Sequence, residues 1–139
     1  MLKGSCLCGG IRYEIDGEVT RIGLCHCSMC RKATGTAFAA NAPVPQEQFR
    51  LISGEELLRS YASSASKSRW FCSRCGSPIY SRSDAYPHLI RVRVGTLDSP
   101  AGRTPDYHYL LSSKADWDTT NDDLPCFGDP ENGAQANAD

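Results

Sequence analysis

The chain has 139 residues, a length that predicts one domain with a modest core and excludes a second domain of ordinary size. Fifteen Lys and Arg residues against sixteen Asp and Glu residues leave a formal charge of −1, so no overall basic field favours nucleic acid as a partner. No stretch approaches the roughly 20 apolar residues of a membrane span, and the N-terminus lacks the apolar segment of a signal peptide. We therefore expect a cytoplasmic protein that binds neither nucleic acid nor membrane.

The N-terminal third is predicted to form short strands. Residues 11–16 alternate apolar and charged side chains, which is the period of a half-buried strand, and residues 19–24 are short and β-prone. Residues 38–42 are the next strand candidate. We expect that strand to end at Pro43 and Pro45, because proline cannot donate to a β-ladder.

The middle of the chain is predicted to hold a hairpin and a loop. Residues 46–49 favour one helical turn, and residues 49–54 and 57–61 read as two strands joined by a glycine-containing turn. Residues 60–68 are rich in Ser and Ala without apolar periodicity, which is typical of a surface loop.

Residues 89–94 form the clearest predicted strand. Ile90 and Val92 fall on one face, whereas Arg91 and Arg93 fall on the other. This alternation predicts one apolar and one charged face.

The C-terminal third adds one more predicted strand, at residues 107–111. No stretch shows helical amphipathicity over about 10 or more residues. Residues 128–139 are mostly Gly, Asn, Ala, Asp and Pro, so we expect one domain over residues 1–127 and a disordered tail after it. The predicted fold is mainly β, a small domain of short antiparallel strands.

Eight cysteines are the most informative residues of the chain. Seven lie in three motifs: C-x-C at Cys6 and Cys8, C-x-C-x-x-C at Cys25, Cys27 and Cys30, and C-x-x-C at Cys72 and Cys75. Clustered cysteines in a cytosolic protein favour metal binding over disulfides, and cysteines of a C-x-C pair are too close for easy bridging. Thiol–disulfide redox chemistry would fit an isolated C-x-x-C, but the βαβ context for it is missing around Cys72.

The C-x-C and C-x-x-C motifs together supply four thiolates, as a closed structural zinc site requires. Such a site would join segments more than sixty residues apart and so carry much of the folding free energy. The alternative partition joins the N-terminal pair to the middle motif. It is less economical, because it leaves the C-x-x-C as half a site.

The middle motif is left with three sulfurs and three candidates for a fourth ligand. His26 lies between two of the cysteines, and neighbouring side chains of extended backbone point to opposite sides, so we expect it to face solvent or to support a ligand. Cys126 could close the site from the C-terminal part of the chain. The third candidate is water or a substrate thiol, which would make the site catalytic. The sequence leaves these alternatives open.

Several segments occur together in the order of a known family. They are G-S-C-L-C-G-G-I-R-Y at residues 4–13, C-H-C-S-M-C-R-K-A-T-G at 25–35, F-C-S-R-C-G-S-P-I-Y at 71–80, G-T-L-D at 95–98, and K-A-D-W and D-D-L-P near the C-terminus. This combination resembles the glutathione-dependent formaldehyde-activating enzymes, also called centromere-protein-V-like domains, over about residues 3–127. The resemblance implies a zinc-containing, mainly β fold of the beta-tent type, the group that also holds methionine sulfoxide reductase B.

The resemblance also implies two zinc ions per chain. Carried over residue by residue, the structural ligands are Cys6, Cys8, Cys72 and Cys75, and the ligands of a catalytic and labile zinc are Cys25, Cys27 and Cys30. The implied reaction joins glutathione and formaldehyde to S-hydroxymethylglutathione, or reverses that step, so its class is a carbon–sulfur lyase. The implied partner is a small thiol of the glutathione type.

Two further expectations follow from the matching segments. Arg31 and Lys32 are candidates to bind the carboxylates of a glutathione-like ligand. We expect His108 and Trp117 to pack rather than to catalyse. The competing hypothesis is a non-catalytic binding module in which both zinc sites are structural.

Overall fold

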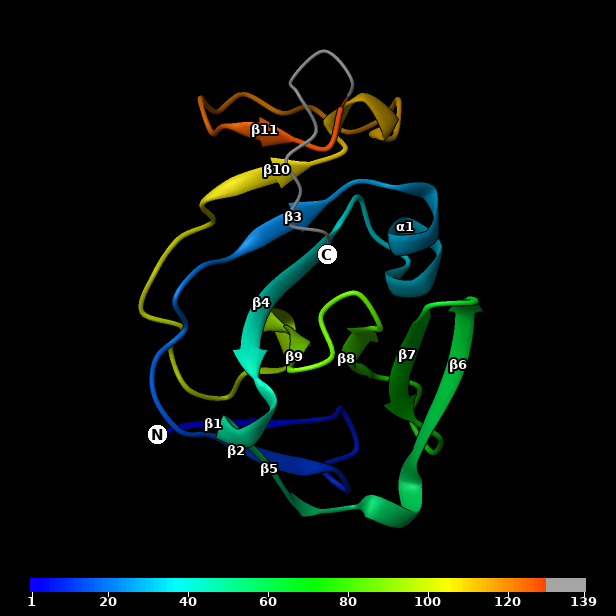
Figure 1. Ribbon diagram of the computed structural model, residues 1–139, viewed down its shortest axis with the longest axis vertical. Helices are drawn as coiled ribbons and strands as arrows, with labels where there is room; N and C mark the ends of the chain where they lie inside the picture. Colours follow the sequence, from blue (N-terminus) through cyan, green and yellow to red (C-terminus); the bar gives the residue numbers. More distant parts are fainter. Residues whose placement is uncertain (130–139) are drawn as a thin grey trace.

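The structure is a computed structural model, and it describes residues 1–129 (Figure 1). Its strands form a three-stranded sheet in the order β1-β2-β5 and an eight-stranded sheet in the order β11-β10-β3-β4-β9-β8-β7-β6. Within the described residues one short α-helix, α1 (Ser28–Thr34), accompanies them. The predicted mainly β class is therefore confirmed.

The small sheet consists of β1 (Leu2–Ser5), β2 (Arg12–Ile15) and β5 (Phe49–Ser53), with β2 antiparallel to both neighbours. Tyr13 and Ile15 of β2 are each 1% exposed. Of the charged residues that alternate with them, Arg12 is exposed and Glu14 is half-buried. The predicted alternation of this strand is therefore confirmed.

The large sheet contains all remaining strands. They are β3 (Gly23–Cys25), β4 (Ala39–Pro45), β6 (Leu58–Ser64), β7 (Lys67–Cys72), β8 (Pro78–Ser83), β9 (Leu89–Arg93), β10 (Tyr107–Tyr109) and β11 (Cys126–Phe127). Most neighbours are antiparallel, but β10 runs parallel to both β3 and β11. The prediction was a purely antiparallel domain, whereas the large sheet is mixed. Parallel strands need a long connection between them, and most of the chain lies between β3 and β10.

The strand predicted at residues 38–42 is β4, which ends at Pro45 as expected but runs through Pro43. Pro43 and Pro45 both lie within the strand, opposite β9. The Gln46 N–H donates to the His88 carbonyl at 2.9 Å, so the even-numbered residues occupy the hydrogen-bonded positions against β9. The prolines therefore face the other edge, beyond Asn41, the last β4 residue that pairs with β3, so no donor is needed there.

The predicted hairpin between residues 49 and 61 is also wrong, although both strands and the helical turn Gln46–Gln48 exist. β5 pairs with β2 in the small sheet, whereas β6 pairs with β7 in the large one. Between them, Gly54 has a φ of 89° and an added Cβ would lie 2.5 Å from the Gly10 carbonyl oxygen. Glycine therefore allows the sharp turn from one sheet to the other, which continues through the 3₁₀ turn Glu55–Leu57.

The segment predicted as a surface loop, residues 60–68, forms the end of β6 and the start of β7. Its side chains are mostly exposed because β6 is the edge strand of the large sheet. Because β6 is exposed on both faces, its sequence does not alternate between apolar and polar residues. That alternation is the signal by which a strand is predicted from sequence.

The predicted strand at residues 89–94 is confirmed as β9, followed by a 3₁₀ turn at Val94–Thr96. Both of its faces are buried, however: Arg91 is 3% and Arg93 5% exposed, as little as their apolar neighbours. Arg91 lies over the Tyr86 ring, with its guanidinium carbon 5.0 Å from the ring centroid, and Arg93 donates to Asn41 Oδ1. Aromatic and amide partners thus cover the charged face.

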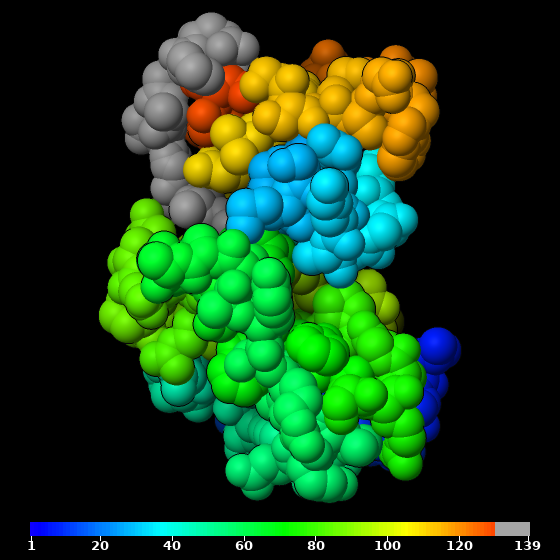
Figure 2. Space-filling model, turned by 90° about the vertical axis from the view of Figure 1, so that its right-hand side faces the viewer, coloured from blue at the N-terminus to red at the C-terminus, as the bar shows by residue number. Residues whose placement is uncertain are grey.

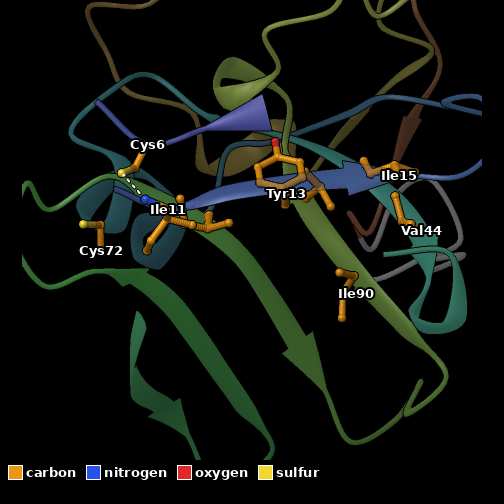
Figure 3. Close-up of a cluster of buried hydrophobic side chains, with 9 residues drawn as sticks. Cys6, Ile11, Tyr13, Ile15, Val44, Cys72 and Ile90 are labelled. Atoms are coloured by element: carbon orange, nitrogen blue, oxygen red, sulfur yellow. Dashed lines mark hydrogen bonds between the residues drawn. The ribbon is translucent and has the colours of Figure 1, made fainter. Parts of the chain in front are cut away.

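The main core lies between the two sheets, and the four-cysteine motif borders it (Figure 3). Its buried members are Cys6, Ile11, Tyr13, Ile15, Val44, Cys72, Ile79, Ile90 and Val92. Figure 3 shows Cys6 and Cys72 together at one end of the cluster, beside Ile11, whose N–H donates to Cys6 Sγ at 3.2 Å. The four-cysteine group and the apolar core therefore form one continuous unit.

The C-terminal part continues past β10 through a 3₁₀ turn at Leu111–Ser113 to β11. Asp129 is 2% exposed and accepts hydrogen bonds from the Ser112 amide and hydroxyl, so packing extends two residues beyond the predicted domain end. Residues 130–139, the rest of the predicted tail, lie outside the described residues. In the described part of the chain, no helix has the length and apolar character for crossing a membrane.

Candidate metal centres

Four cysteines from two motifs far apart in the sequence converge at one end of the main core. The sulfurs of Cys6, Cys8, Cys72 and Cys75 all lie within 4.8 Å of one another, and neighbouring sulfurs are 3.5 Å apart for Cys6 and Cys8 and 3.9 Å for Cys8 and Cys72. Four thiolates at the usual zinc–sulfur distance of about 2.3 Å from one tetrahedral ion would be about 3.8 Å apart. The donor set and its spacing therefore fit a closed tetrahedral zinc site.

Two glycine-containing turns hold these sulfurs in place. The Gly9 N–H donates to the Cys6 carbonyl at 3.0 Å, and the Gly76 N–H donates to the Cys72 carbonyl at 2.8 Å. Both glycines are left-handed, with φ of 76° and 81°, a conformation that side chains disfavour. The glycine that follows each motif thus lets the chain fold back, so that both sulfurs of the motif face the same point.

Neighbouring donors favour the thiolate form of two of these cysteines. The Arg74 guanidinium, with Nε 3.4 Å from Cys8 Sγ, lowers the pKa of the Cys8 thiol. The hydrogen bond with the Ser77 hydroxyl lowers the pKa of Cys75 to about 5, whereas burial raises the pKa of Cys72. Because metals bind the thiolate, this environment prepares part of the group for an ion.

The three cysteines of the middle motif form a second group, with their sulfurs within 4.8 Å of one another. Cys25 ends β3, Cys27 caps the N-terminus of α1, and Cys30 lies within the helix. The Cys30 N–H donates to Cys27 Sγ at 3.3 Å, which is the hydrogen bond of an N-cap. A helix of seven residues is too short to show a periodic pattern, so the sequence did not predict it.

Two cationic side chains, Arg69 and Lys67, lie near this second group. The Arg69 guanidinium nitrogens lie 3.8 and 3.9 Å from Cys30 Sγ, and Arg69 is only 9% exposed. Hydrogen bonding with Cys25 lowers the pKa of Cys27 to about 2, and the same contact raises the pKa of Cys25. Burial lowers the pKa of the nearby Lys67, an effect that the charge on Cys30 opposes. The site thus places negative charge on sulfur beside a buried guanidinium.

His26 lies between two of these cysteines but points away from them. It is fully buried, and its Nε2 is 2.8 Å from Nδ1 of His108, whose Nε2 is in turn 2.9 Å from Asp122 Oδ1. The other nitrogen of His26, Nδ1, lies 3.7 Å from Asp118 Oδ2, and burial lowers the pKa of His26. The possible roles of His26 as fourth ligand or solvent-facing residue are therefore wrong. His108 is 2% exposed and packs against the His26 ring, as expected, but it does so within a polar network.

No local signal in the sequence could have shown this network. His26 and His108 are 82 positions apart, and His108 and Asp122 are 14 positions apart. The pairing of β3 with β10 brings the two histidines together.

Cys126 lies outside both groups. It sits on β11, and its thiol points to the Leu124 carbonyl at 3.6 Å. In residues 1–129, no further Cys, His, Asp or Glu joins the three-cysteine group. Trp117 is 67% exposed, so its predicted packing role is wrong.

Arg31 and Lys32, the two predicted ligand contacts, point in different directions. Arg31 donates to the His26 carbonyl at 3.3 Å and to the Ser113 carbonyl at 3.4 Å, so it connects α1 to the C-terminal segment.

Lys32 borders a groove of about 410 Å³ between α1 and the β6–β7 hairpin, which we call the α1 groove. Its lining residues are Met29, Lys32, Ala33, Tyr61, Ser63 and Arg69. Figure 2 shows the blue and cyan residues around α1 above the green residues of β6 and β7.

Comparison with known proteins agrees with this geometry. Residues 1–113 match the family model described as glutathione-dependent formaldehyde-activating enzyme. A Halomonas elongata protein provisionally named as such an enzyme is 30% identical over 125 residues, which cover 84% of this chain and 79% of that protein. An uncharacterized lyase of Schizosaccharomyces pombe is 32% identical over 78 residues, 56% of this chain and 55% of its own length.

A solved structure shares the fold. The crystal structure of a Rhodobacter sphaeroides protein superposes with a TM-score of 0.62 at 27% sequence identity, and the match covers 74% of this chain and 97% of that one. The family model covers most of the chain, and both cysteine groups lie within it. The protein therefore belongs to the glutathione-dependent formaldehyde-activating enzyme family.

Proposed function

We propose that the protein is a zinc-dependent carbon–sulfur lyase that forms or breaks a thiol adduct such as S-hydroxymethylglutathione. One observation carries this proposal. Three cysteine sulfurs converge beside the α1 groove, and within residues 1–129 no fourth protein ligand joins them. Structural zinc sites use four protein ligands, whereas catalytic sites use three and leave one position for water or substrate.

The two cysteine groups would have separate roles. Cys6, Cys8, Cys72 and Cys75 would hold a structural zinc ion, and Cys25, Cys27 and Cys30 would hold the second ion. When bound there, the second ion supplies positive charge that lowers the pKa of a substrate thiol.

The chain itself contributes charge balance and orientation. Arg69 offsets the negative charge of the three-cysteine group through its contact with Cys30. The α1 groove holds the remainder of the thiol substrate, and a positioned thiol reacts faster with a small aldehyde than a free one. In the forward direction a carbon–sulfur bond forms between thiol sulfur and formaldehyde carbon, and the thiol proton ends on the former carbonyl oxygen. The reverse step breaks that bond and returns the proton to sulfur.

The hypothesis of a non-catalytic module with two structural sites requires a fourth protein ligand for the second group. Its two candidates were His26 and Cys126. His26 is engaged by His108 and Asp118, and Cys126 lies outside the group, so the structure offers this alternative no support.

Exchange spectroscopy on the equilibrium between glutathione and formaldehyde tests the proposed reaction. The zinc-loaded wild type should raise the exchange rate, and Cys27→Ser should return it to the uncatalysed rate. Cys126→Ser is the matched control, because it removes a cysteine outside both groups and should behave as the wild type. A wild-type rate equal to the uncatalysed rate would refute the proposed reaction.

A further inference from the structure

His26 lies between two of the three sulfur donors of the second group, Cys25 and Cys27. Cys25 ends β3, and the backbone of Cys27 is extended, with φ of −62° and ψ of 154°. Side chains alternate along an extended backbone, so the two cysteines share one side and His26 lies on the other. A contact that fixes His26 therefore also fixes the direction of two sulfurs.

Hydrogen bonds hold both the backbone and the ring of His26. Its N–H donates to the Tyr109 carbonyl at 3.0 Å, and its carbonyl accepts from Arg31 Nε at 3.3 Å. Its ring Nε2 lies 2.8 Å from His108 Nδ1. Tyr109 and His108 are adjacent residues of β10, which runs parallel beside β3. The C-terminal part of the chain thus holds the residue between the two cysteines.

Asp122 orients the two rings from the surface. A carboxylate only accepts hydrogen bonds, so His108 Nε2, 2.9 Å from Asp122 Oδ1, is the donor of that pair. In a neutral ring His108 Nδ1 is then the acceptor, and His26 Nε2 donates to it. The side chain of Asp122 is 46% exposed, whereas His26 is fully buried and His108 is 2% exposed. One chain of contacts therefore leads from the surface to the backbone between two sulfurs.

We propose that His26, His108 and Asp122 are positioning residues of the three-cysteine site, and that the C-terminal segment thereby sets the affinity of this site for a metal ion. This inference rests on the proposed function, because it requires an ion at the three cysteines. His108 and Asp122 act through His26. Removing a group that orients metal ligands typically weakens metal binding by roughly 10- to 100-fold. Loss of the His108 ring should therefore weaken the second site by about ten-fold and leave the four-cysteine site unchanged.

Cadmium NMR observes the two sites separately. Cadmium binds thiolates as zinc does, and each occupied site gives its own resonance, so the cadmium-loaded wild type should show one resonance for each cysteine group. In His108→Leu the resonance of the three-cysteine group should shift, and a competing chelator should remove that ion at about ten-fold lower concentration. The resonance of the four-cysteine group should stay in place, which shows that the domain is still folded.

A conservative variant separates positioning from packing. His108→Asn places an amide oxygen near the position of Nδ1, where it can accept from His26, so it should restore most of the affinity that His108→Leu loses. Restored affinity depends on the hydrogen bond, because leucine fills the space better than asparagine does. Equal weakening by both variants, equal weakening of both metal sites, or an unchanged second site in His108→Leu would each overturn the inference.

Asp122→Ala tests the surface end of the network. It should weaken the second site by about two- to five-fold, since the contact is partly exposed. Asp123→Ala is the matched control, because it removes an exposed carboxylate next in the chain and should leave both resonances unchanged. Equal effects of the two alanine variants would contradict the role of Asp122.

The same samples distinguish this inference from the proposed reaction. If the wild type binds two ions but its zinc-loaded form does not accelerate the exchange between glutathione and formaldehyde, the reaction is wrong, and the resonances still decide the role of the network. If exchange is accelerated and the variants keep the wild-type affinity at the second site, the inference is wrong and the reaction stands. A single resonance in the wild type would refute both.

Discussion

Replacing Cys72 with serine is expected to unfold the domain, whereas replacing Cys27 is expected to leave it folded. The difference follows from how far along the chain each cysteine group reaches. Cys8 and Cys72 are 64 positions apart, whereas Cys25 and Cys30 are only five positions apart (30 − 25 = 5). Closing a long loop removes more conformational freedom from the unfolded chain than closing a short one.

The magnitudes can be worked from these separations. Treating each metal group as one cross-link, closure of the long loop contributes about 4 kcal/mol to the free energy of unfolding and closure of the short loop about 2 kcal/mol. Cys72 is also fully buried in the main core, so an uncompensated serine hydroxyl there costs about 1–3 kcal/mol more. The sum for Cys72→Ser, about 5–7 kcal/mol, reaches the whole net stability of many single domains, roughly 5–15 kcal/mol. Cys27 is half-buried and outside the main core, so its loss costs far less.

Urea unfolding in zinc-containing buffer, followed by circular dichroism, measures this difference. Cys72→Ser should show little folded baseline, and Cys27→Ser should keep a cooperative transition at a somewhat lower midpoint. Cys126→Ser serves as the control for loss of a thiol outside both groups. Equal destabilisation by Cys72→Ser and Cys27→Ser would refute the division into a long-range and a local group.

Three further predictions concern the core and the histidine network. Burial raises the pKa of Tyr13 to about 12, so the unfolded chain loses this proton first and stability should fall by up to about 3 kcal/mol as pH rises from 10 to 12. Tyr13→Phe should lack that part of the pH dependence in urea titrations, and identical slopes for both proteins would contradict it. Ile79→Ala removes a fully buried side chain and should lower the free energy of unfolding by about 2–5 kcal/mol in the same assay. A decrease below about 1 kcal/mol would contradict the packing described. His108→Leu leaves buried His26 Nε2 without its partner and should cost about 1–3 kcal/mol, whereas unchanged stability would show that this contact is dispensable.

The features that the sequence predicted well depend on short spacings. The division of seven cysteines into groups of four and three came from motif spacing and the ligand count of zinc, and the structure brings together the same two sets. The strand at β9 was found because its side chains alternate over five residues. In both cases the informative residues are close neighbours along the chain.

The features that could not be predicted depend on partners far along the chain. β5 and β6 follow each other in sequence but pair with different sheets, and nothing within their own residues specifies this. The burial of Arg91 and Arg93 requires Tyr86 and Asn41 to cover them, and the direction of His26 requires β10 beside β3. Local patterns identify elements, whereas tertiary packing decides their neighbours and their solvent exposure.

The chain separation between the motifs also sets an order of events during synthesis. The three-cysteine group is complete once Cys30 has left the ribosome, whereas the four-cysteine group must wait for Cys75. Since domains fold as the chain emerges, the thiols of Cys6 and Cys8 stay unmatched while nearly seventy further residues are made. The site that anchors the finished domain is therefore the last to become available to a metal, and the site proposed for chemistry is the first.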